Sequence, residues 1–347
     1  MNVIVIGEFG IERFATHISQ NLRELEHNVT EIEFGFPSLA YQNKIFRKLS
    51  NGANLLISNS SLGNEIRMKK IRDAIKKENP DMILSTYDYL MPDQIKDIKL
   101  LTNSPIVLWY PDSLAGFSKS YFMNAPYDFI FFKDPYIVNR FYDVLRCSVF
   151  YMPECFNPIV HKITSKYNPE DYECDITTAG NLHPYRVAFF KNLIDLNLSI
   201  KIWGFPSPNW LDSSEIDKFF QQKPVHDSEK VAAFRGAKIV VNNLLYSEVI
   251  GLNVRAFEIA GAGAFQLIDN RIGISDLFED GVELVTFSNV SDLKKKIKFY
   301  LNEPDARAEI AAAGYKAAIE KHTYASRLRL MIDTIFNNGV GYPTSHY

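Results

Sequence analysis

The hydrophobic positions of this chain form short apolar runs separated by amphipathic stretches. Runs such as Val3–Ile6 and Ile106–Tyr110 are typical of strands buried on both faces of a sheet. Stretches such as Ile11–Leu25 have the pattern of a helix with one buried face. Strands that alternate with helices indicate parallel sheets wound with right-handed crossovers. The pattern therefore predicts an α/β protein from end to end.

A polar stretch interrupts this alternation and predicts a domain boundary. Pro153, Pro158 and Pro169 punctuate residues 153–172, which carry little periodicity. We predict an N-terminal domain over 1–160 and a C-terminal domain over 161–323, and we assign residues 324–347 to a C-terminal helical segment. The predicted strands are Val3–Ile6, Val29–Phe34, Met82–Ser85, Ile106–Tyr110, Phe129–Phe132, Val149–Met152, Asp175–Ala179, Ser199–Trp203, Lys238–Val241, Ala264–Ile268 and Glu283–Phe287. The predicted helices are Ile11–Leu25, Glu65–Lys77, Ile137–Leu145, Tyr185–Leu196, Ser228–Arg235, a helix around Glu258, Asp292–Leu301 and Tyr324–Phe336.

Length and composition limit the class of protein. A chain of 347 residues suits two domains of roughly 150 residues each. The net charge of −3 argues against a nucleic-acid-binding protein. Three cysteines without a Cys-x-x-Cys pair favour reduced thiols in the cytoplasm. The first apolar run is too short for a signal peptide, and no apolar stretch is long enough to span a bilayer. We expect a soluble cytoplasmic protein.

The stretch from Asn253 to Phe265 is the most informative for function. It places Glu258 in a short helix that runs into the next strand, with Arg255 three residues earlier. Helix N-termini attract anions, and a carboxylate near one can accept hydrogen bonds from ligand hydroxyls. A sugar nucleotide offers both a diphosphate and ribose hydroxyls. The alternative is an amphipathic helix with a solvated Glu258.

Two glycine-containing loops follow predicted strands and precede helices. Gly7-Glu-Phe-Gly10 lacks the full dinucleotide-binding pattern. It either lines the binding site of an acceptor substrate, with Glu8 facing a cleft, or is a plain turn between strand and helix. Gly180-Asn-Leu-His-Pro-Tyr-Arg186 could present backbone N–H groups and the Arg186 guanidinium to a pair of phosphates.

Carboxylates at two further strand ends are candidate general bases. Asp112 ends the run Trp109–Ser113, and Asp88 follows the strand Met82–Ser85. Either could take a proton from an acceptor hydroxyl, as could Glu8. The alternative for each aspartate is a turn-forming or capping role.

The sequence gives little support for a metal site and some support for a basic surface that binds an anionic partner. No two aspartates are separated by one residue, and the histidines lack ligand spacing, so we expect no metal. The segment Lys44–Lys77 carries nine Lys or Arg residues against Glu65 and Asp73. This segment could contact the anionic inner face of a membrane, or it could bind an anionic acceptor. The alternative is a solvated helix face and a loop.

Several of these motifs together resemble a known family. They are Gly180–Arg186, Ile202-Trp-Gly204, Pro224-Val-His226, the run Phe234–Asn242, Asn253–Gly263 and His322-Thr-Tyr324. In this order they resemble group-1 glycosyltransferases of the GT-B fold, in the subset similar to the spore-maturation protein CgeB. The resemblance covers roughly residues 170–335 and is fainter before them, where Trp109–Asp112 matches best.

The resemblance implies two Rossmann-like, doubly wound domains that face each other across a cleft, with the final helix packed back on the first. The C-terminal domain would hold the nucleotide sugar. Glu258 would bind the ribose, Arg186 and Arg255 the diphosphate, and backbone around Trp203-Gly204 and Val225-His226 the base. Asn253 and Gly180 belong to the same implied site. Many relatives carry a second Glu eight residues before the ribose-binding one. Here that position is Ile250, with Glu248 out of register, so the contact to the donor sugar and the stereochemistry are left unassigned.

We therefore predict a metal-independent glycosyltransferase that uses a nucleotide-sugar substrate, with UDP favoured, and no separate cofactor. The acceptor would be a hydroxyl of a saccharide, lipid-linked or protein acceptor, in cell-surface polysaccharide or glycoconjugate synthesis. Two alternatives remain open. One is a nucleotide-sugar epimerase on the same fold, and the other is a non-catalytic structural protein of an envelope or spore coat.

Overall fold

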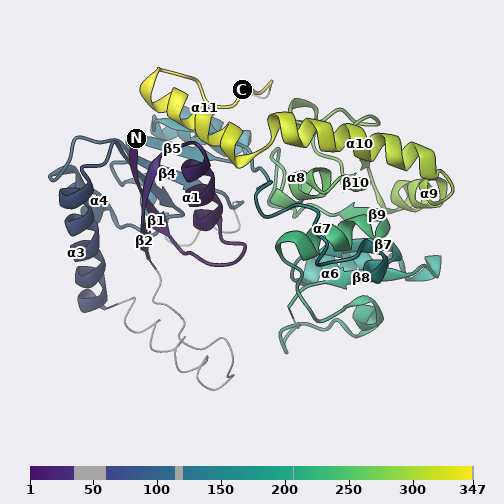
Figure 1. Ribbon diagram of the computed structural model, residues 1–347. Coiled ribbons are helices and arrows are strands. Elements are labelled where there is room, and N and C mark those ends of the chain that lie inside the picture. The colour runs from purple at the N-terminus through teal and green to yellow at the C-terminus, as the bar shows by residue number, and fades with distance from the viewer. Residues whose placement is uncertain (35–59, 114–119, 206, 346–347) are drawn as a thin grey trace. The chain divides into compact units, whose positions relative to one another are not determined.

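The computed structural model describes residues 1–34, 60–113, 120–205 and 207–345. These residues form two compact units (Figure 1). Unit 1 comprises Met1–Phe132, Ile137–Tyr151 and Leu328–Gly341. Unit 2 comprises Lys133–Tyr136, Met152–Arg327 and Tyr342–Tyr347. The short segments Lys133–Tyr136 and Tyr342–Tyr347 thus belong to unit 2, although unit 1 directly precedes each of them in the sequence.

Unit 1 is built on a parallel sheet of six strands in the order β2-β1-β3-β4-β5-β6. The strands are β1 (Asn2–Gly7), β2 (Asn28–Glu33), β3 (Met82–Thr86), β4 (Ile106–Tyr110), β5 (Phe129–Phe132) and β6 (Val149–Tyr151). Every residue of β3 and β4 is buried. This explains the apolar runs at Met82–Leu84 and Ile106–Tyr110, because helices cover both faces of a parallel sheet.

The helices and short helical turns of unit 1 alternate with its strands along the chain. They are α1 (Phe14–Glu24), α3 (Ser61–Glu78), α4 (Pro92–Lys99), most of α5 (Pro135–Arg140), the π-helical turn η3 (Phe141–Leu145), the short turn η2 (Tyr121–Met123) and most of α11 (Tyr324–Phe336). The Ser60 hydroxyl caps α3 by accepting from the Gly63 N–H, at 3.0 Å. The same helix ends at Asn79, in the left-handed conformation that asparagine tolerates.

Unit 2 contains a parallel sheet of five strands in the order β11-β10-β9-β7-β8. The strands are β7 (Cys174–Ala179), β8 (Ile200–Trp203), β9 (Ala237–Asn242), β10 (Gln266–Asp269) and β11 (Val285–Phe287). In chain order this is the doubly wound arrangement of unit 1 without its last strand. Ligands of such sheets bind at the carboxyl ends of strands where the winding reverses. In unit 2 that point lies between β7 and β9.

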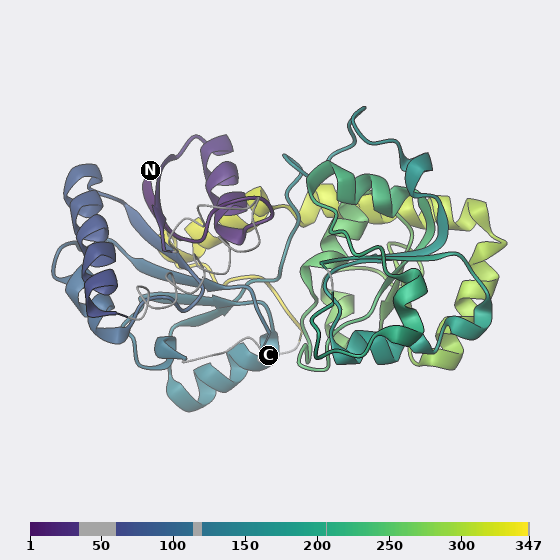
Figure 2. The ribbon, with the colours of Figure 1, turned by 90° about the horizontal axis from the view of Figure 1, so that it is seen from below.

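Helices lie on both sides of this second sheet (Figure 2). One core layer joins the sheet to α6 (Pro184–Lys191), η6 (Ser214–Phe219) and α9 (Val290–Leu301), through residues such as Phe190, Phe219 and Leu293. The other layer joins it to α7 (Asp227–Arg235) and α8 (Val254–Gly261). A long helix, α10 (Pro304–Lys321), lies beside α8 (Figure 1). The remaining short turns are η4 (Pro169–Tyr172), η5 (Ile194–Leu196) and η7 (Ile272–Asp276).

The predicted two-domain α/β fold is confirmed, and the differences lie in the helices. The helix expected over Ile137–Leu145 is α-helical only to Arg140 and continues as η3, none of whose residues is buried. The helix expected over Tyr185–Leu196 stops at Lys191, and η5 follows. Two helices, α4 and α10, were not predicted. The buried face of α10 consists largely of small residues, Gly314, Ala317 and Ala318, which do not stand out as an apolar stripe.

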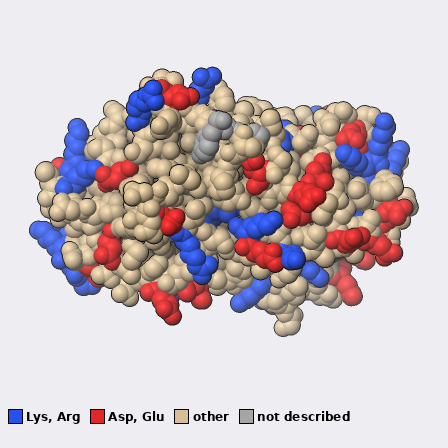
Figure 3. Space-filling model, turned by 90° about the horizontal axis from the view of Figure 1, so that it is seen from above, with Lys and Arg blue, Asp and Glu red and all other residues tan. Residues whose placement is uncertain are grey.

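The basic segment predicted over 44–77 is only partly described, because residues 44–59 lie outside the described residues. On α3, the side chains of Lys69, Lys70, Lys76 and Lys77 are exposed. Acidic and basic side chains are interspersed on the face of the molecule shown in Figure 3. Among the described residues, no helix has the length and apolar character needed to cross a membrane. The predicted membrane contact stays a prediction.

Candidate functional site

The three candidate bases all lie at the carboxyl edge of the sheet in unit 1. Glu8 follows β1, Asp88 follows β3 and Asp112 follows β4, and parallel strands bring these ends to one edge. Glu8 is ion-paired with Arg13 at 3.2 Å. Asp112 is exposed.

Asp88 has the capping role that the sequence left open. Its carboxylate accepts hydrogen bonds from the backbone N–H groups of Tyr121 and Phe122, at 2.5 and 2.9 Å, and so holds the start of η2. Burial raises the pKa of Asp88 to about 6, and the two backbone bonds oppose the rise. Asp88 is therefore a poorer candidate base, because its carboxylate already accepts two backbone hydrogen bonds.

Aromatic side chains surround these carboxylates in unit 1. The Tyr89 ring stacks on Phe34 with centroids 4.6 Å apart, and Tyr87 contacts Tyr89 at 5.8 Å and Phe14 at 6.2 Å. Phe14, Tyr87 and Tyr89 are each half-buried. Burial raises the pKa of Tyr89, and the charges of three carboxylates, those of Glu8, Glu33 and Asp112, raise it further. The phenol therefore lies among acidic groups at this edge.

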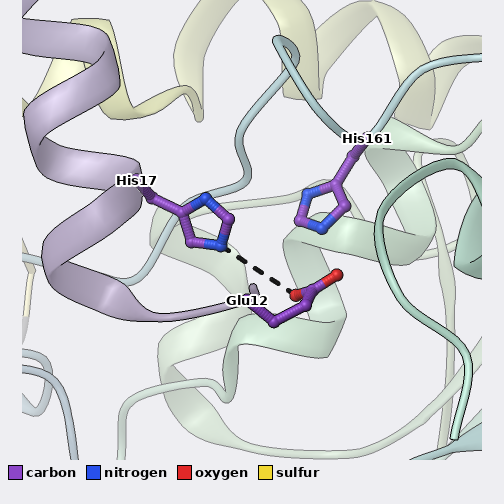
Figure 4. A group of neighbouring side chains, drawn as sticks. All are labelled: Glu12, His17 and His161. Carbon is purple, nitrogen blue, oxygen red and sulfur yellow. Dashed lines mark ion pairs between the residues drawn. The ribbon is translucent and has the colours of Figure 1, made fainter. Parts of the chain in front are cut away.

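A histidine of unit 1 lies close to the chain that leads from β1 into α1. His17 Nε2, on α1, is 3.9 Å from Glu12 Oε2 (Figure 4). Glu12 has a positive φ of 57°, which turns the chain just before α1. His161, also drawn in Figure 4, belongs to unit 2. The predicted absence of a metal and of a separate cofactor stays a prediction.

In unit 2, two glycines allow the loops after β7 and β8 to approach closely. Gly180 has a φ of +132°, and a Cβ placed there would lie 2.7 Å from Arg186 Nη1. A Cβ on Gly204 would lie 2.7 Å from the carbonyl oxygen of Gly180. The Gly180 N–H donates to the Trp203 carbonyl at 2.7 Å. The two predicted glycines therefore shape the wall against which Arg186 packs.

The two predicted arginines lie on the N-terminal turns of α6 and α8. Arg186 is only 4% exposed; its Nη1 donates to the Asn181 carbonyl at 2.7 Å and its Nε to Asn243 Oδ1 at 3.4 Å. Arg255 is half-buried, and its Nη1 reaches Thr178 Oγ1 at 3.4 Å. Burial first, and then the positive charge of Arg255, hold the pKa of Arg186 well below its usual value. Burial likewise lowers the pKa of Arg255.

Neither guanidinium has a carboxylate within salt-bridge distance among the described residues. The nearby carboxylates are instead paired with lysines. Glu248 Oε1 lies 2.9 Å from Lys133 Nζ, and Glu258 Oε1 lies 2.8 Å from Lys230 Nζ. Two neighbouring guanidiniums that lack a salt-bridge partner in this part of the chain are suited to an anion with several oxygens.

Glu258 is buried rather than solvated, which excludes the alternative interpretation of its helix. Glu258 is 5% exposed and lies in the second turn of α8. Its Oε1, which pairs with Lys230, also lies 3.7 Å from His161 Nε2. The other oxygen, Oε2, accepts no hydrogen bond within the described ranges. That oxygen can accept from a ligand hydroxyl.

Asn253 has a structural task at the start of α8. Its Oδ1 accepts from the Ala256 N–H at 3.2 Å and so caps the helix. Its amide also exchanges two hydrogen bonds with Asn242, each of 3.0 Å. Asn253 therefore positions the helix that carries Arg255 and Glu258.

The residues predicted to contact the base lie around the ends of β8 and the start of α7. The Trp203 indole points into the core, where Nε1 donates to Thr177 Oγ1 at 3.1 Å, and Val225 is buried. His226 is half-buried and lies 6.2 Å from the ring of Phe205, which is 55% exposed. The structure thus adds Phe205, an aromatic surface that the motifs did not include.

Sequence reasoning also missed the lysines that pair with the acidic residues of this site. Lys230 lies on α7, and Lys133 comes from the four-residue segment that unit 2 takes from the first half of the chain. Lys133 is buried and also lies 3.8 Å from Glu154. No spacing links Lys133 to Glu248 in the sequence, so only the fold reveals this pair.

A separate polar pocket in unit 2 has a volume of about 530 Å³. None of the predicted donor-site residues lines it. The Asp276 carboxylate in this pocket accepts hydrogen bonds from Thr344 and Ser345, and the Asp280 carboxylate accepts hydrogen bonds from Thr286. These acidic groups hold the local chain together, so the pocket is a poorer candidate than the arginine site.

Comparison with known proteins agrees with this geometry. Residues 186–333 match the model of a family described as "Glycosyl transferase-like". Over 194 residues the chain is 27% identical to spore protein CgeB of Bacillus subtilis, a stretch covering 51% of this chain and 58% of that protein. The chain thus spans less than two thirds of the length of this curated relative. The predicted resemblance to CgeB-like group-1 glycosyltransferases is confirmed.

Solved structures show the same fold. Sucrose-phosphate synthase from Thermosynechococcus elongatus superposes with a TM-score of 0.65 at 11% identity, covering 97% of this chain and 100% of that one. HepE from Anabaena, in complex with UDP, has a TM-score of 0.65 at 12% identity, with the same two coverages. At such identities the likeness shows the GT-B fold alone, and this part of the prediction is confirmed.

Proposed function

We propose that this protein is a glycosyltransferase that moves a sugar from a nucleotide diphosphate, with UDP favoured, to a hydroxyl of a saccharide acceptor. The observation that carries the proposal is the pair Arg186 and Arg255, enclosed in unit 2 without a carboxylate partner in the described chain. A buried cation is unfavourable unless a counter-ion compensates it, and a diphosphate would do so.

The neighbouring groups suit the rest of a nucleotide. Glu258 Oε2 is available to ribose hydroxyls, and the rings of Phe205 and His226 offer a surface for the base. HepE, which shares the fold, was crystallised with UDP, and this supports the choice of donor. We assign Arg186 and Arg255 to the diphosphate, Glu258 to the ribose, and Phe205 with His226 to the base.

Transfer would then proceed through charge neutralisation. A carboxylate, Asp112 or Glu8, takes the proton of the acceptor hydroxyl, whose oxygen bonds to the anomeric carbon. The bond from that carbon to the diphosphate breaks, and the diphosphate leaves with the electron pair. The two guanidiniums stabilise the departing charge, and the sugar passes through an oxocarbenium-like transition state. Holding donor and acceptor together supplies the remaining rate enhancement.

The aromatic edge of unit 1 supports a saccharide as the acceptor. Half-buried rings at Phe14, Tyr87 and Tyr89 lie beside the carboxylates Glu8 and Asp112. Flat rings pack against the C–H faces of a pyranose, and carboxylates accept hydrogen bonds from its hydroxyls. A role in polysaccharide or glycoconjugate synthesis fits an acceptor of this kind.

A nucleotide panel tests the donor assignment. We expect UDP to raise the melting temperature more than GDP, dTDP or CMP, because a ligand at about 100 times its dissociation constant adds roughly 2.7 kcal/mol of stability. Differential scanning fluorimetry measures this shift. If none of the four nucleotides shifts the transition, the arginine pair is not a nucleotide site.

Incubation of the protein with a UDP-sugar, with and without an acceptor, distinguishes the alternative functions. Slow release of UDP from a UDP-sugar without acceptor, accelerated by oligosaccharides, supports the transferase. Interconversion of the donor sugar without any acceptor would indicate an epimerase. Binding without turnover under all conditions would indicate a structural protein.

The Tyr89→Ala variant tests the acceptor surface. We expect its KM for a saccharide acceptor to rise at least about fivefold, because the stacking surface is lost, while the dissociation constant of UDP stays unchanged. Tyr89→Phe should keep most of the acceptor affinity. Tyr142→Ala, at an exposed tyrosine of η3 in the same unit, is the matched control. Equal acceptor KM values in Tyr89→Ala and the control would refute the assignment.

A further inference from the structure

Asn243 occupies the position in unit 2 where ligands of doubly wound sheets bind. It directly follows β9, which pairs with β7, and β7 leads into the loop of Gly180 and Asn181. The order of the strands reverses between β7 and β9. Nothing in the motifs singled out this residue, because it continues the apolar strand Lys238–Val241 as the second of two asparagines.

The orientation of the Asn243 amide is fixed by Arg186. The guanidinium has only donors, so its Nε–H must meet the amide oxygen, and Oδ1 accepts this bond at 3.4 Å. The amide nitrogen therefore points away from this contact. Asn243 is 1% exposed, and its Nδ2 is buried with no hydrogen-bond partner among the described residues.

The neighbouring amides show that this orphan donor is an exception. Asn242 Nδ2 donates to both Asn253 Oδ1 and Gln266 Oε1, at 3.0 and 3.1 Å. Gln266 Nε2 donates to the Ala256 carbonyl at 3.2 Å. Buried polar groups are nearly always paired, so an unpaired donor at a ligand-binding position indicates a partner that the protein itself does not provide.

The charges around Asn243 define what that partner is. The side chains of Arg186 and Arg255 make the surroundings cationic, and burial together with Arg255 lowers the pKa of Arg186. The carboxylates of Glu248 and Glu258 are already ion-paired with Lys133 and Lys230, respectively. An acceptor atom that is stable here is an anionic oxygen, as in a phosphate group.

We propose that Asn243 is a binding residue for the donor diphosphate: Oδ1 orients the Arg186 guanidinium, and Nδ2 donates a hydrogen bond to a phosphate oxygen. This assignment rests on the proposed function. It also explains the choice of an amide over a carboxylate. An aspartate would neutralise Arg186 and repel the ligand, whereas asparagine orients the arginine and leaves its charge to the anion.

The Asn243→Asp variant tests the assignment with a change of one charge and almost no change of shape. We expect its affinities for UDP and for inorganic pyrophosphate to fall at least about thirtyfold in calorimetry. Its melting temperature without ligand should stay equal or rise, because the new carboxylate pairs with Arg186. Asn243→Ala should weaken both ligands at least about fivefold. Asn302→Asp, at an exposed position after α9, controls for net charge.

The outcomes distinguish this assignment from the function on which it rests. If the native chain binds UDP and pyrophosphate and Asn243→Asp binds them as tightly, Asn243 is not a ligand residue although the donor site stands. A lower melting temperature with unchanged affinities would show a purely structural role. If the native chain binds neither compound, the donor site itself is refuted.

Discussion

The Arg186→Met variant should bind UDP at least about a hundredfold more weakly than the native chain, yet melt at an equal or higher temperature. Hydrogen bonds to a charged group contribute about 1.5–3 kcal/mol each, and two lost bonds to a diphosphate amount to at least about 3 kcal/mol. In the ligand-free chain, however, Arg186 is 4% exposed without a counter-ion. Methionine fills similar space and needs none. Calorimetry and thermal melts of the same samples measure both effects.

Arg329→Met supplies the control for this experiment, since Arg329 is exposed on α11. It should change neither UDP affinity nor melting temperature appreciably. Unaltered UDP binding by a folded Arg186→Met protein would remove the observation on which the proposed function rests. A large drop in melting temperature would instead show that Arg186 serves the fold through its bonds to Asn181 and Asn243.

The Glu258→Ala variant should lose UDP affinity at least tenfold while its affinity for pyrophosphate stays the same or increases. UDP has ribose hydroxyls that can donate hydrogen bonds to the Glu258 carboxylate, and pyrophosphate has no such hydroxyls. Removing the carboxylate also takes a negative charge from beside Lys230 and Arg255, and this change favours an anion. Breaking a buried ion pair costs about 3–5 kcal/mol, so the variant should also melt earlier.

A double variant separates the two consequences of that change. Glu258→Ala with Lys230→Met removes both charges and should recover much of the stability without recovering UDP affinity. Parallel losses of UDP and pyrophosphate binding in Glu258→Ala would indicate a general disturbance of the site and contradict a ribose contact. Calorimetry with the two ligands provides the comparison.

The individual site residues differ in how far their chemistry could be predicted. The placement of Arg186 and Arg255 at the ligand-binding edge could be predicted, because both follow predicted strands and lie at helix starts. Helix N-termini in α/β proteins gather at one edge of the sheet. For Asp88 the sequence left two roles open, and only the turn at Tyr121 and Phe122, far along the chain, supplies the N–H groups that it caps. The assignment of Asn253 to the ligand stays a prediction, and the structure adds its hydrogen bonds to Asn242 and to the start of α8.

By itself, the sequence determined the alternation of strands and helices, the parallel sheets and the edge at which ligand-binding groups collect, because these depend on local periodicity and the handedness of crossovers. The tertiary structure alone decided which charges are compensated. Lys133 meets Glu248 and Lys230 meets Glu258, while the enclosed Arg186 and the Asn243 amide keep donors to spare. Such pairings join residues distant in the chain, and electrostatic compensation depends on distance in space and burial, neither of which is encoded in spacing along the sequence.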